Sequence, residues 1–291
     1  VAEGAVSSTV EILKTLKEKA VNAANDTNTD ADRQTIQKEL DQSIDQINDN
    51  ANVTFNGQYL VDGSKNSKTT ATCTALTNQS LAETTGSSTK LTELKARNND
   101  SLNIQATDTI TVSWVKDGKT YTASTQVGSL SLDAALKSMK DGAQTLSTDI
   151  SLSAGKTSFI AIDGSGNSVY TASGESSITI ASKANGVDGQ ISGFTISITD
   201  NTGAVRKSAN AALDAFDETL RAQNASVDNS INLQIGTKAN QTIKVGLTDM
   251  KAQALGLQGK NNDTIQVGNQ EQANAAINVL DAAIQKALDQ Q

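Results

Sequence analysis

The chain has 291 residues, a hydrophobic fraction of 36%, an aromatic fraction of only 3% and a formal net charge of −8. A core with so few rings must be built from Leu, Ile, Val and Ala, which suits thin layers such as helix seams and small sheets. The acidic balance disfavours nucleic acid and membrane as partners, because phosphate backbones and anionic lipids repel negative charge. The single cysteine, Cys73, excludes an internal disulfide and a cysteine-based metal cage.

The first 51 residues predict two amphipathic helices. In residues 1–25 the apolar positions recur at steps of three and four and form one stripe that narrows to alanine, which lets another helix approach closely. The polar run "NDTNTD" ends this helix, and Thr29 or Asp30 can cap the next one. The members of the two stripes are Val6, Val10, Leu13, Leu16, Ala20, Ala23 and Ala24, then Ile36, Leu40, Ile44 and Ile47.

The middle of the chain is rich in short β-like runs. "NVTFNGQYLVDG" predicts a hairpin, because Asn56-Gly57 tolerates the positive φ of a tight turn. From about Ser64 the composition shifts to Ser, Thr, Gly and Asn. Residues 108–127 predict two strands around a turn at Asp117-Gly118. Further along we expect a short helix capped by Ser131, a strand–turn–strand unit over 158–182, and one more strand before residue 200.

The C-terminal third predicts a helix over 204–223, two strands joined by "GTKANQ", and a final helix over 269–291. The final helix carries an approximate heptad seam, Ala273, Ala276, Ile277, Leu280, Ala283, Ile284 and Ala287. We expect the two ends of the chain to pack as one pillar, with the β-rich material at its tip. Whether the helix over 204–223 belongs to the pillar or to the β-rich part stays open.

The predicted fold class is therefore α+β: a long antiparallel, coiled-coil-like helical rod with a β-hairpin, plus an inserted β-rich outer domain with short helices. The predicted domains are residues 1–63, the N-terminal part of the rod; 64–228, the inserted domain; and 229–291, the C-terminal part of the rod.

Acidic residues that could act as a general acid and base are plentiful in the sequence, but other catalytic signals are missing. The sequence has no histidine, which excludes Ser-His and Cys-His dyads and His-ligated zinc. The acidic residues fall on the polar faces of the predicted helices, where solvated charge is the simpler interpretation. "DGSGN" at 163–167 lacks the later acidic positions of a calcium loop. We therefore expect no enzyme, no cofactor and no metal site.

Two stretches resemble bacterial flagellin. "AVNAANDTNTDADRQTIQKEL" with the later "FNG" is similar to the family's paired helices and hairpin, and "LQIGTKANQTIKVGLTDMKAQALGL" is similar to its "LQIGA…DM…ALGL" stretch. "INVLDAAIQKALDQQ" resembles the start of its terminal helix. The resemblance covers roughly residues 1–63 and 229–291, and residues 64–228 stand where flagellins carry a variable outer domain.

The resemblance implies a structural subunit of the bacterial flagellar filament, located outside the cell, which assembles with other flagellin subunits in its full-length form. It also implies a shortened molecule that lacks both terminal polymerisation segments. Well-recognised flagellins contact an innate immune receptor through an arginine, a leucine and a glutamate. The matching positions here are Thr15, Lys19 and Glu39, so only the glutamate is kept. The resemblance therefore implies weak receptor activation.

The alternative hypothesis is a surface-displayed flagellin homologue that acts as an adhesin or polysaccharide-binding protein through its inserted domain. The rings of Trp114, Tyr121 and Tyr170 are of the kind that stack on sugars of surface or host glycans. The neighbouring lysines that could meet an acidic polysaccharide are Lys116, Lys119, Lys137 and Lys140.

Overall fold

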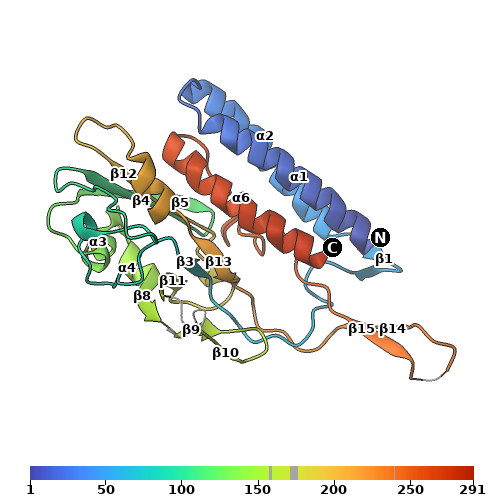
Figure 1. Cartoon of the computed structure of the whole chain (residues 1–291). Helices are drawn as coiled ribbons and strands as arrows, with labels where there is room; N and C mark the ends of the chain where they lie inside the picture. Colours follow the sequence, from blue (N-terminus) through green and yellow to red (C-terminus); the bar gives the residue numbers. More distant parts are fainter. Residues whose placement is uncertain (157–158, 171–175, 239) are drawn as a thin grey trace.

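The structure is a computed structural model that describes residues 1–156, 159–170, 176–238 and 240–291. Figure 1 shows three long helices, α1, α2 and α6, lying side by side, with a β-rich part along one side of α6. A two-stranded hairpin, β14–β15, projects away from both. The α+β class is confirmed, and the two ends of the chain do form one helical bundle.

Helices α1 (Ala2–Ala23) and α2 (Asp30–Ala51) follow the predicted stripes. Thr29 caps α2 through a capping box: its hydroxyl accepts the Asp32 N–H at 3.3 Å, and the Asp32 carboxylate accepts the Thr29 N–H at 2.9 Å. The Arg33 side chain, only 8% exposed, donates to the Ala23 carbonyl at 2.9 Å and so satisfies a carbonyl left free at the end of α1. The connection between the two helices is therefore held at both ends.

Helix α6 (Gln270–Gln290) is the centre of the molecule, because it is apolar on two sides. One side packs on α1 with the predicted seam, and the ion pair between Lys17 and Asp281 (2.5 Å) adds a contact between the two helices. Ala275 and Val279, which are fully buried and lie outside the predicted seam, meet the sheet of the β-rich part instead.

The β-rich part contains a three-stranded sheet in the order β12-β4-β5 and a four-stranded sheet in the order β13-β3-β11-β8. The strands of the first sheet are β4 (Thr109–Lys116), β5 (Lys119–Gln126) and β12 (Gly193–Thr199). The strands of the second sheet are β3 (Ala75–Asn78), β8 (Ile150–Lys156), β11 (Ser176–Ser182) and β13 (Asp217–Leu220). All neighbouring strands in both sheets are antiparallel.

Shorter elements complete the chain. The small hairpins are β1 (Thr54–Phe55) with β2 (Gln58–Tyr59), β6 (Lys140–Asp141) with β7 (Gln144–Thr145), β9 (Phe159–Ile162) with β10 (Ser168–Tyr170), and β14 (Ile231–Gln234) with β15 (Thr242–Val245). The short helices are α3 (Leu132–Ser138), α4 (Leu146–Asp149) and α5 (Lys207–Leu213), with 3-10 turns at Leu91–Glu93 and Val187–Gly189. Ser131 caps α3 as predicted, by accepting the Ala134 N–H.

The β-rich part lies along the side of α6 and not at the tip of the pillar, so the predicted placement is wrong. The reason is the second apolar side of α6. Strand β12 approaches it so closely that a Cβ at Gly193 would lie 2.7 Å from Val279 Cγ2 and 2.8 Å from the Ala275 carbonyl oxygen. Val115 of β4 is buried in the same core as the helices.

A second close approach joins the turn between β4 and β5 to the loop that precedes α6. A Cβ added at Gly118 would lie 1.9 Å from the Asp263 carbonyl oxygen, and one at Gly259 would lie 1.9 Å from the Asp117 carbonyl oxygen. The ion pair between Lys119 and Asp263 (3.3 Å) lies beside this contact. Backbone therefore packs on backbone here, and side chains could not be accommodated.

The predicted helix over 204–223 is also wrong beyond residue 213. Helix α5 covers only Lys207–Leu213 and packs on β12, so it belongs to the β-rich part. The Asp214 carboxylate accepts the Ile196 N–H at 3.0 Å, and the ring of Phe216 packs edge-on against Phe194 at 5.3 Å. The chain then continues as β13, which pairs with β3. Sheet pairing outweighs the helical periodicity in this segment.

Candidate subunit-contact surface

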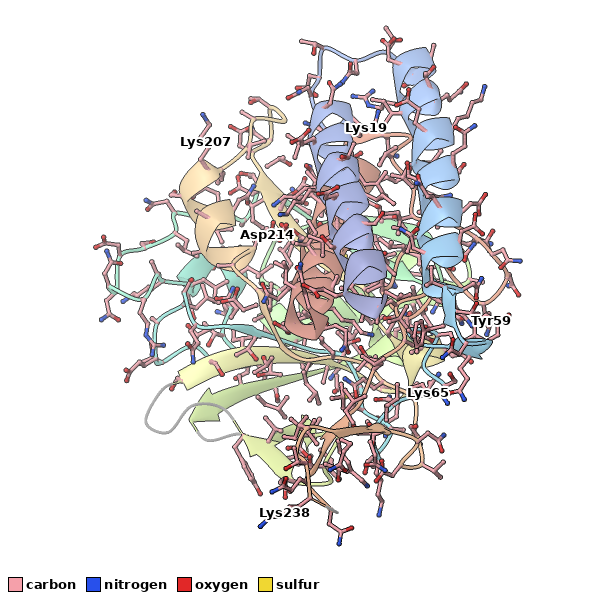
Figure 2. All side chains as sticks on the ribbon, turned by 90° about the vertical axis from the view of Figure 1, so that its right-hand side faces the viewer. Lys19, Tyr59, Lys65, Lys207, Asp214 and Lys238 are labelled. Atoms are coloured by element: carbon pink, nitrogen blue, oxygen red, sulfur yellow. The ribbon has the colours of Figure 1, made fainter. Side chains whose placement is uncertain are left out.

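The predicted receptor-contact residues lie on the paired helices α1 and α2. Lys19 is labelled beside the paired helices in Figure 2. Its ammonium forms an ion pair with the Glu39 carboxylate across the two helices, at side-chain exposures of 34% and 49%. Thr15 is exposed one turn earlier on α1, and its hydroxyl donates to the Glu11 carbonyl at 3.1 Å. The structure thus brings Lys19 and Glu39 together, and Thr15 lies on the same stretch of α1. An exposed pair of this kind contributes little to stability.

The hairpin β14–β15 has one apolar face and one polar face. In the antiparallel register, Ile231 pairs with Val245 and Leu233 pairs with Ile243, and alternation adds Ile235 to the same side. We call Ile231, Leu233, Ile235, Ile243 and Val245 the apolar hairpin face. Leu233, Ile235 and Ile243 are 49%, 72% and 48% exposed. The alternation of apolar and polar residues is visible in the sequence and predicts the two strands. It does not predict that other parts of the chain leave the apolar hairpin face exposed.

The polar side of the hairpin is organised by Asp228. The Lys244 ammonium lies 2.7 Å from its carboxylate, and Ser230 donates to the same group. Hydrogen bonds from Lys244 and Ser230 lower the pKa of the Asp228 carboxyl to about 2. Asn232, Gln234 and Thr242 occupy the remaining positions of this side. The hairpin is therefore a two-sided element whose polar side suits water.

The hairpin joins the rest of the molecule only at its base among the described residues. The Leu247 N–H donates to the Lys65 carbonyl at 2.9 Å, and the Asn229 N–H donates to the Asn66 carbonyl at 3.0 Å. Figure 2 places Lys65 near this base and Lys238 at the far end, away from the helices. A lone two-stranded hairpin is marginally stable in water, and exposed apolar clusters mark interaction sites. The apolar hairpin face is therefore left exposed by the residues that the structure describes.

Two of the three predicted glycan-contact rings, Trp114 and Tyr121, lie together, whereas Tyr170 packs against Phe159 instead. Trp114 is fully buried, its ring stacks on Tyr121 at 5.6 Å, and its Nε1 donates to Asp149 at 3.3 Å. It has no ring face free for a sugar, and its contacts are those of a core residue. Tyr170, by contrast, is 56% exposed and packs edge-on against Phe159 at 5.8 Å. Of the predicted rings, Tyr170 presents the most open surface.

The predicted lysines are largely engaged with acidic neighbours. Lys116 pairs with the buried Asp149 at 2.5 Å, Lys119 with Asp263, and Lys137 with Asp133 at 2.7 Å. Pairing of this kind reduces the positive field that an acidic polysaccharide would meet. Lys140, in β6, is exposed.

A cavity of about 340 Å³ lies between α6 and the β-rich part. Among its charged lining groups, the Arg221 guanidinium contacts the Glu218 carboxylate at 3.0 Å, and it also reaches the Asp289 carboxylate at 2.5 Å. Burial raises the pKa of the Glu218 carboxyl, and Arg221 opposes that change. Within the described residues, no group of three or more His, Cys, Asp or Glu side chains could hold a metal ion. The cavity therefore lies at the junction between α6 and the β-rich part.

No described helix is both long enough and apolar enough to cross a bilayer. Cys73 is buried, and burial raises the pKa of its thiol, which makes the thiol less reactive.

Comparison with known proteins finds relatives for the N-terminal part of the chain. Residues 1–66 match the family model described as the bacterial flagellin N-terminal helical region. A curated flagellin from Clostridium tyrobutyricum is 51% identical over 65 residues, which make up 22% of this chain and 17% of that protein. The match therefore spans less than a fifth of the relative's length. The resemblance predicted for residues 229–291 lies outside it.

Solved structures of flagellar proteins are also similar at low identity. FliC from Burkholderia pseudomallei is 18% identical, with coverage of 100% of this chain and 97% of that chain and a TM-score of 0.27. The flagellar junction protein FlgL from Legionella pneumophila is 14% identical, with coverage of 99% and 86% and a TM-score of 0.31. TM-scores this low do not establish a shared fold. The similarity to flagellin therefore rests on residues 1–66.

Proposed function

We propose that this chain is a structural subunit of a bacterial flagellar filament, proceeding from the flagellin-type helical region that residues 1–66 carry. In this proposal α1, α2 and α6 form the filament-building rod, and the chain divides into 1–63, 64–228 and 229–291. The subunit assembles with other flagellin subunits and works outside the cell as part of the flagellum. The observation that carries the proposal is the 51% identity over the paired helices.

The apolar hairpin face supports self-association as the mode of action. Leu233 and Ile243 form a directly opposed cross-strand pair that is about half exposed on both sides, and Ile235 extends the apolar strip. Burying such side chains against another subunit is favourable at roughly 25 cal/mol per Å² of apolar surface removed from water. A repeating subunit offers the same partner surface at every step, which a heterologous contact needs in order to build an open filament.

Replacing Leu233 and Ile243 together with threonine is expected to abolish filament formation. Threonine retains β propensity, so the hairpin can still form while its apolar face is lost. The gene carrying both changes is returned to a strain from which it has been deleted, and electron microscopy then scores filaments. Protein released into the medium as unassembled subunits shows that folding and export remain intact.

The matched control changes Asn232 and Gln234, on the opposite side of the same strand, to threonine and should leave filaments normal. Normal filaments from the Leu233/Ile243 variant would overturn the role of the apolar hairpin face. A deletion strain that still builds and rotates normal filaments would overturn the filament function itself.

We also propose weak activation of the innate immune receptor that recognises flagellins. The supporting observation is the ion pair between Lys19 and Glu39, which engages the retained glutamate and puts charge where an apolar contact would lie. In a receptor reporter assay, this protein should signal far less than the variant Thr15→Arg with Lys19→Leu. Equal signalling by the two proteins would contradict this proposal. Glycan binding by the β-rich part stays a prediction for Tyr170, and none of the described contacts favours it.

A further inference from the structure

The sequence contains two Asn–Gly dipeptides, Asn56–Gly57 and Asn185–Gly186. In such a pair the glycine nitrogen can reach the asparagine side-chain carbonyl, because glycine has no Cβ to hinder the approach or restrict the backbone. The two dipeptides are chemically alike in an unfolded chain. Their surroundings in the folded chain differ sharply.

Asn56–Gly57 lies in an open turn. Both residues are exposed, and a Cβ added at Gly57 would meet nothing within 4 Å. Among the described contacts, neither the Gly57 N–H nor the Asn56 side-chain amide takes part in a hydrogen bond. The nitrogen that would attack and the carbonyl that would be attacked are therefore both free.

The turn can also open at low cost. It is held by β1 and β2, which are two residues long each and exposed throughout. Asn56 and Gly57 have φ values of 51° and 75°, which is the left-handed geometry of a tight hairpin. Short, exposed pairings of this kind open far more readily than the core of a protein. Opening lets Asn56 leave the left-handed region and adopt the geometry needed for attack.

Asn185–Gly186 is held in place. The Gly186 N–H donates to the Thr72 carbonyl at 2.8 Å, and Gly186 itself is buried. A Cβ at Gly186 would lie 2.8 Å from Asn224 Oδ1, and this same oxygen accepts the Val187 N–H at 2.9 Å. Attack by the Gly186 nitrogen requires this packed segment to open and the hydrogen bond to Thr72 to break.

We propose that Asn56 is a site of spontaneous deamidation in the folded protein and that the fold protects Asn185. The Gly57 nitrogen attacks Asn56 Cγ, a new N–Cγ bond forms, the Cγ–NH2 bond breaks, and ammonia leaves with the proton from the attacking nitrogen. The resulting five-membered succinimide is opened by water at one of its two carbonyl carbons. The products are aspartate and isoaspartate, and no oxidant, reductant or enzyme is needed.

The modification changes the base of the bundle. Each product adds a carboxylate to an already acidic chain with a formal net charge of −8. Isoaspartate also lengthens the main chain by one carbon, which the two-residue turn between Phe55 and Gln58 does not accommodate. The β1–β2 pairing is then lost, and the aromatic side chains of Phe55 and Tyr59 are released from their fixed positions. This inference does not depend on the proposed function.

The test follows both sites in the same sample. The full chain is incubated folded in mildly alkaline buffer and, in parallel, unfolded in urea. Trypsin then releases peptide 39–65, which holds Asn56, and peptide 184–206, which holds Asn185. Digestion in water labelled with heavy oxygen marks any deamidation that happens during handling. Fragment masses identify the asparagine that has been converted.

In the folded protein we expect conversion at Asn56 to be about fivefold faster than at Asn185, which is the factor that corresponds to one net hydrogen bond of typical strength. In urea the two rates should be equal. Asn56→Gln serves as the site control and should remove the fast phase alone. Equal rates at Asn56 and Asn185 in the folded chain, or faster conversion at Asn185, would overturn the proposal.

Discussion

Replacing Trp114 with alanine is expected to destabilise the protein by about 3–5 kcal/mol, the range for removing a large buried aromatic side chain. Trp114 is fully buried, stacks on Tyr121 and donates to the buried Asp149. The change would therefore leave a cavity and also remove a hydrogen bond from Asp149. Urea unfolding followed by circular dichroism measures the effect.

Tyr170→Ala is the matched control. Because Tyr170 is 56% exposed, its replacement should change the free energy of unfolding by less than about 0.5 kcal/mol. If both variants unfold at the same urea concentration as the parent, Trp114 is not a core residue. If Trp114→Ala remains stable yet loses binding to a glycan, the alternative hypothesis of a sugar platform would regain its basis.

Replacing Gly193 with alanine is expected to cost about 1–3 kcal/mol, the usual range for overpacking. Its new Cβ would lie under 3 Å from Val279 Cγ2 and from the backbone oxygen of Ala275, and backbone of a helix cannot move aside cheaply. Hydrogen exchange should show the loss locally, as faster exchange of amides in β12 and in α6 around residues 275–279.

Gly4→Ala makes the same chemical change in an open position. Gly4 lies in α1, and a Cβ there meets nothing within 4 Å, so this variant should be stabilised by up to about 1 kcal/mol through helix propensity. The two glycine variants should thus move the unfolding midpoint in opposite directions. A Gly193→Ala protein as stable as the parent would show that β12 and α6 are not tightly packed.

The helices were predictable because each has a signal that is complete within its own sequence. The stripes of α1 and α2 continue without interruption, Thr29 supplies the cap, and Asn56-Gly57 supplies the turn. The predicted seam of α6 was correct for its contact with α1. Ala275 and Val279 were missed because alanine and valine beside a seam indicate nothing about which sheet will meet them.

The misplaced helix over 204–223 has a different cause. Its periodicity continues past Leu213, but the Asp214 contact with Ile196 and the pairing of β13 with β3 depend on strands far away in the sequence. The candidate site divides in the same way. Lys19 and Glu39 could be assigned to the helix surface by their spacing in the sequence. Their ion pair could not be predicted, because it depends on how α1 and α2 pack against each other. The burial of Trp114 likewise depends on tertiary packing.

The glycine contacts between α6 and the β-rich part have a mechanical consequence. Gly193 of β12 packs against the backbone of α6, and Gly118 packs against the backbone of Gly259, so the two parts touch at two separate points along the junction. Two such fixed points resist twisting as well as separation, unlike a single flexible tether. We therefore expect a sideways force on the β-rich part to be transmitted as torque to α6 and to α1, which packs on it. The two parts should then move together under shear.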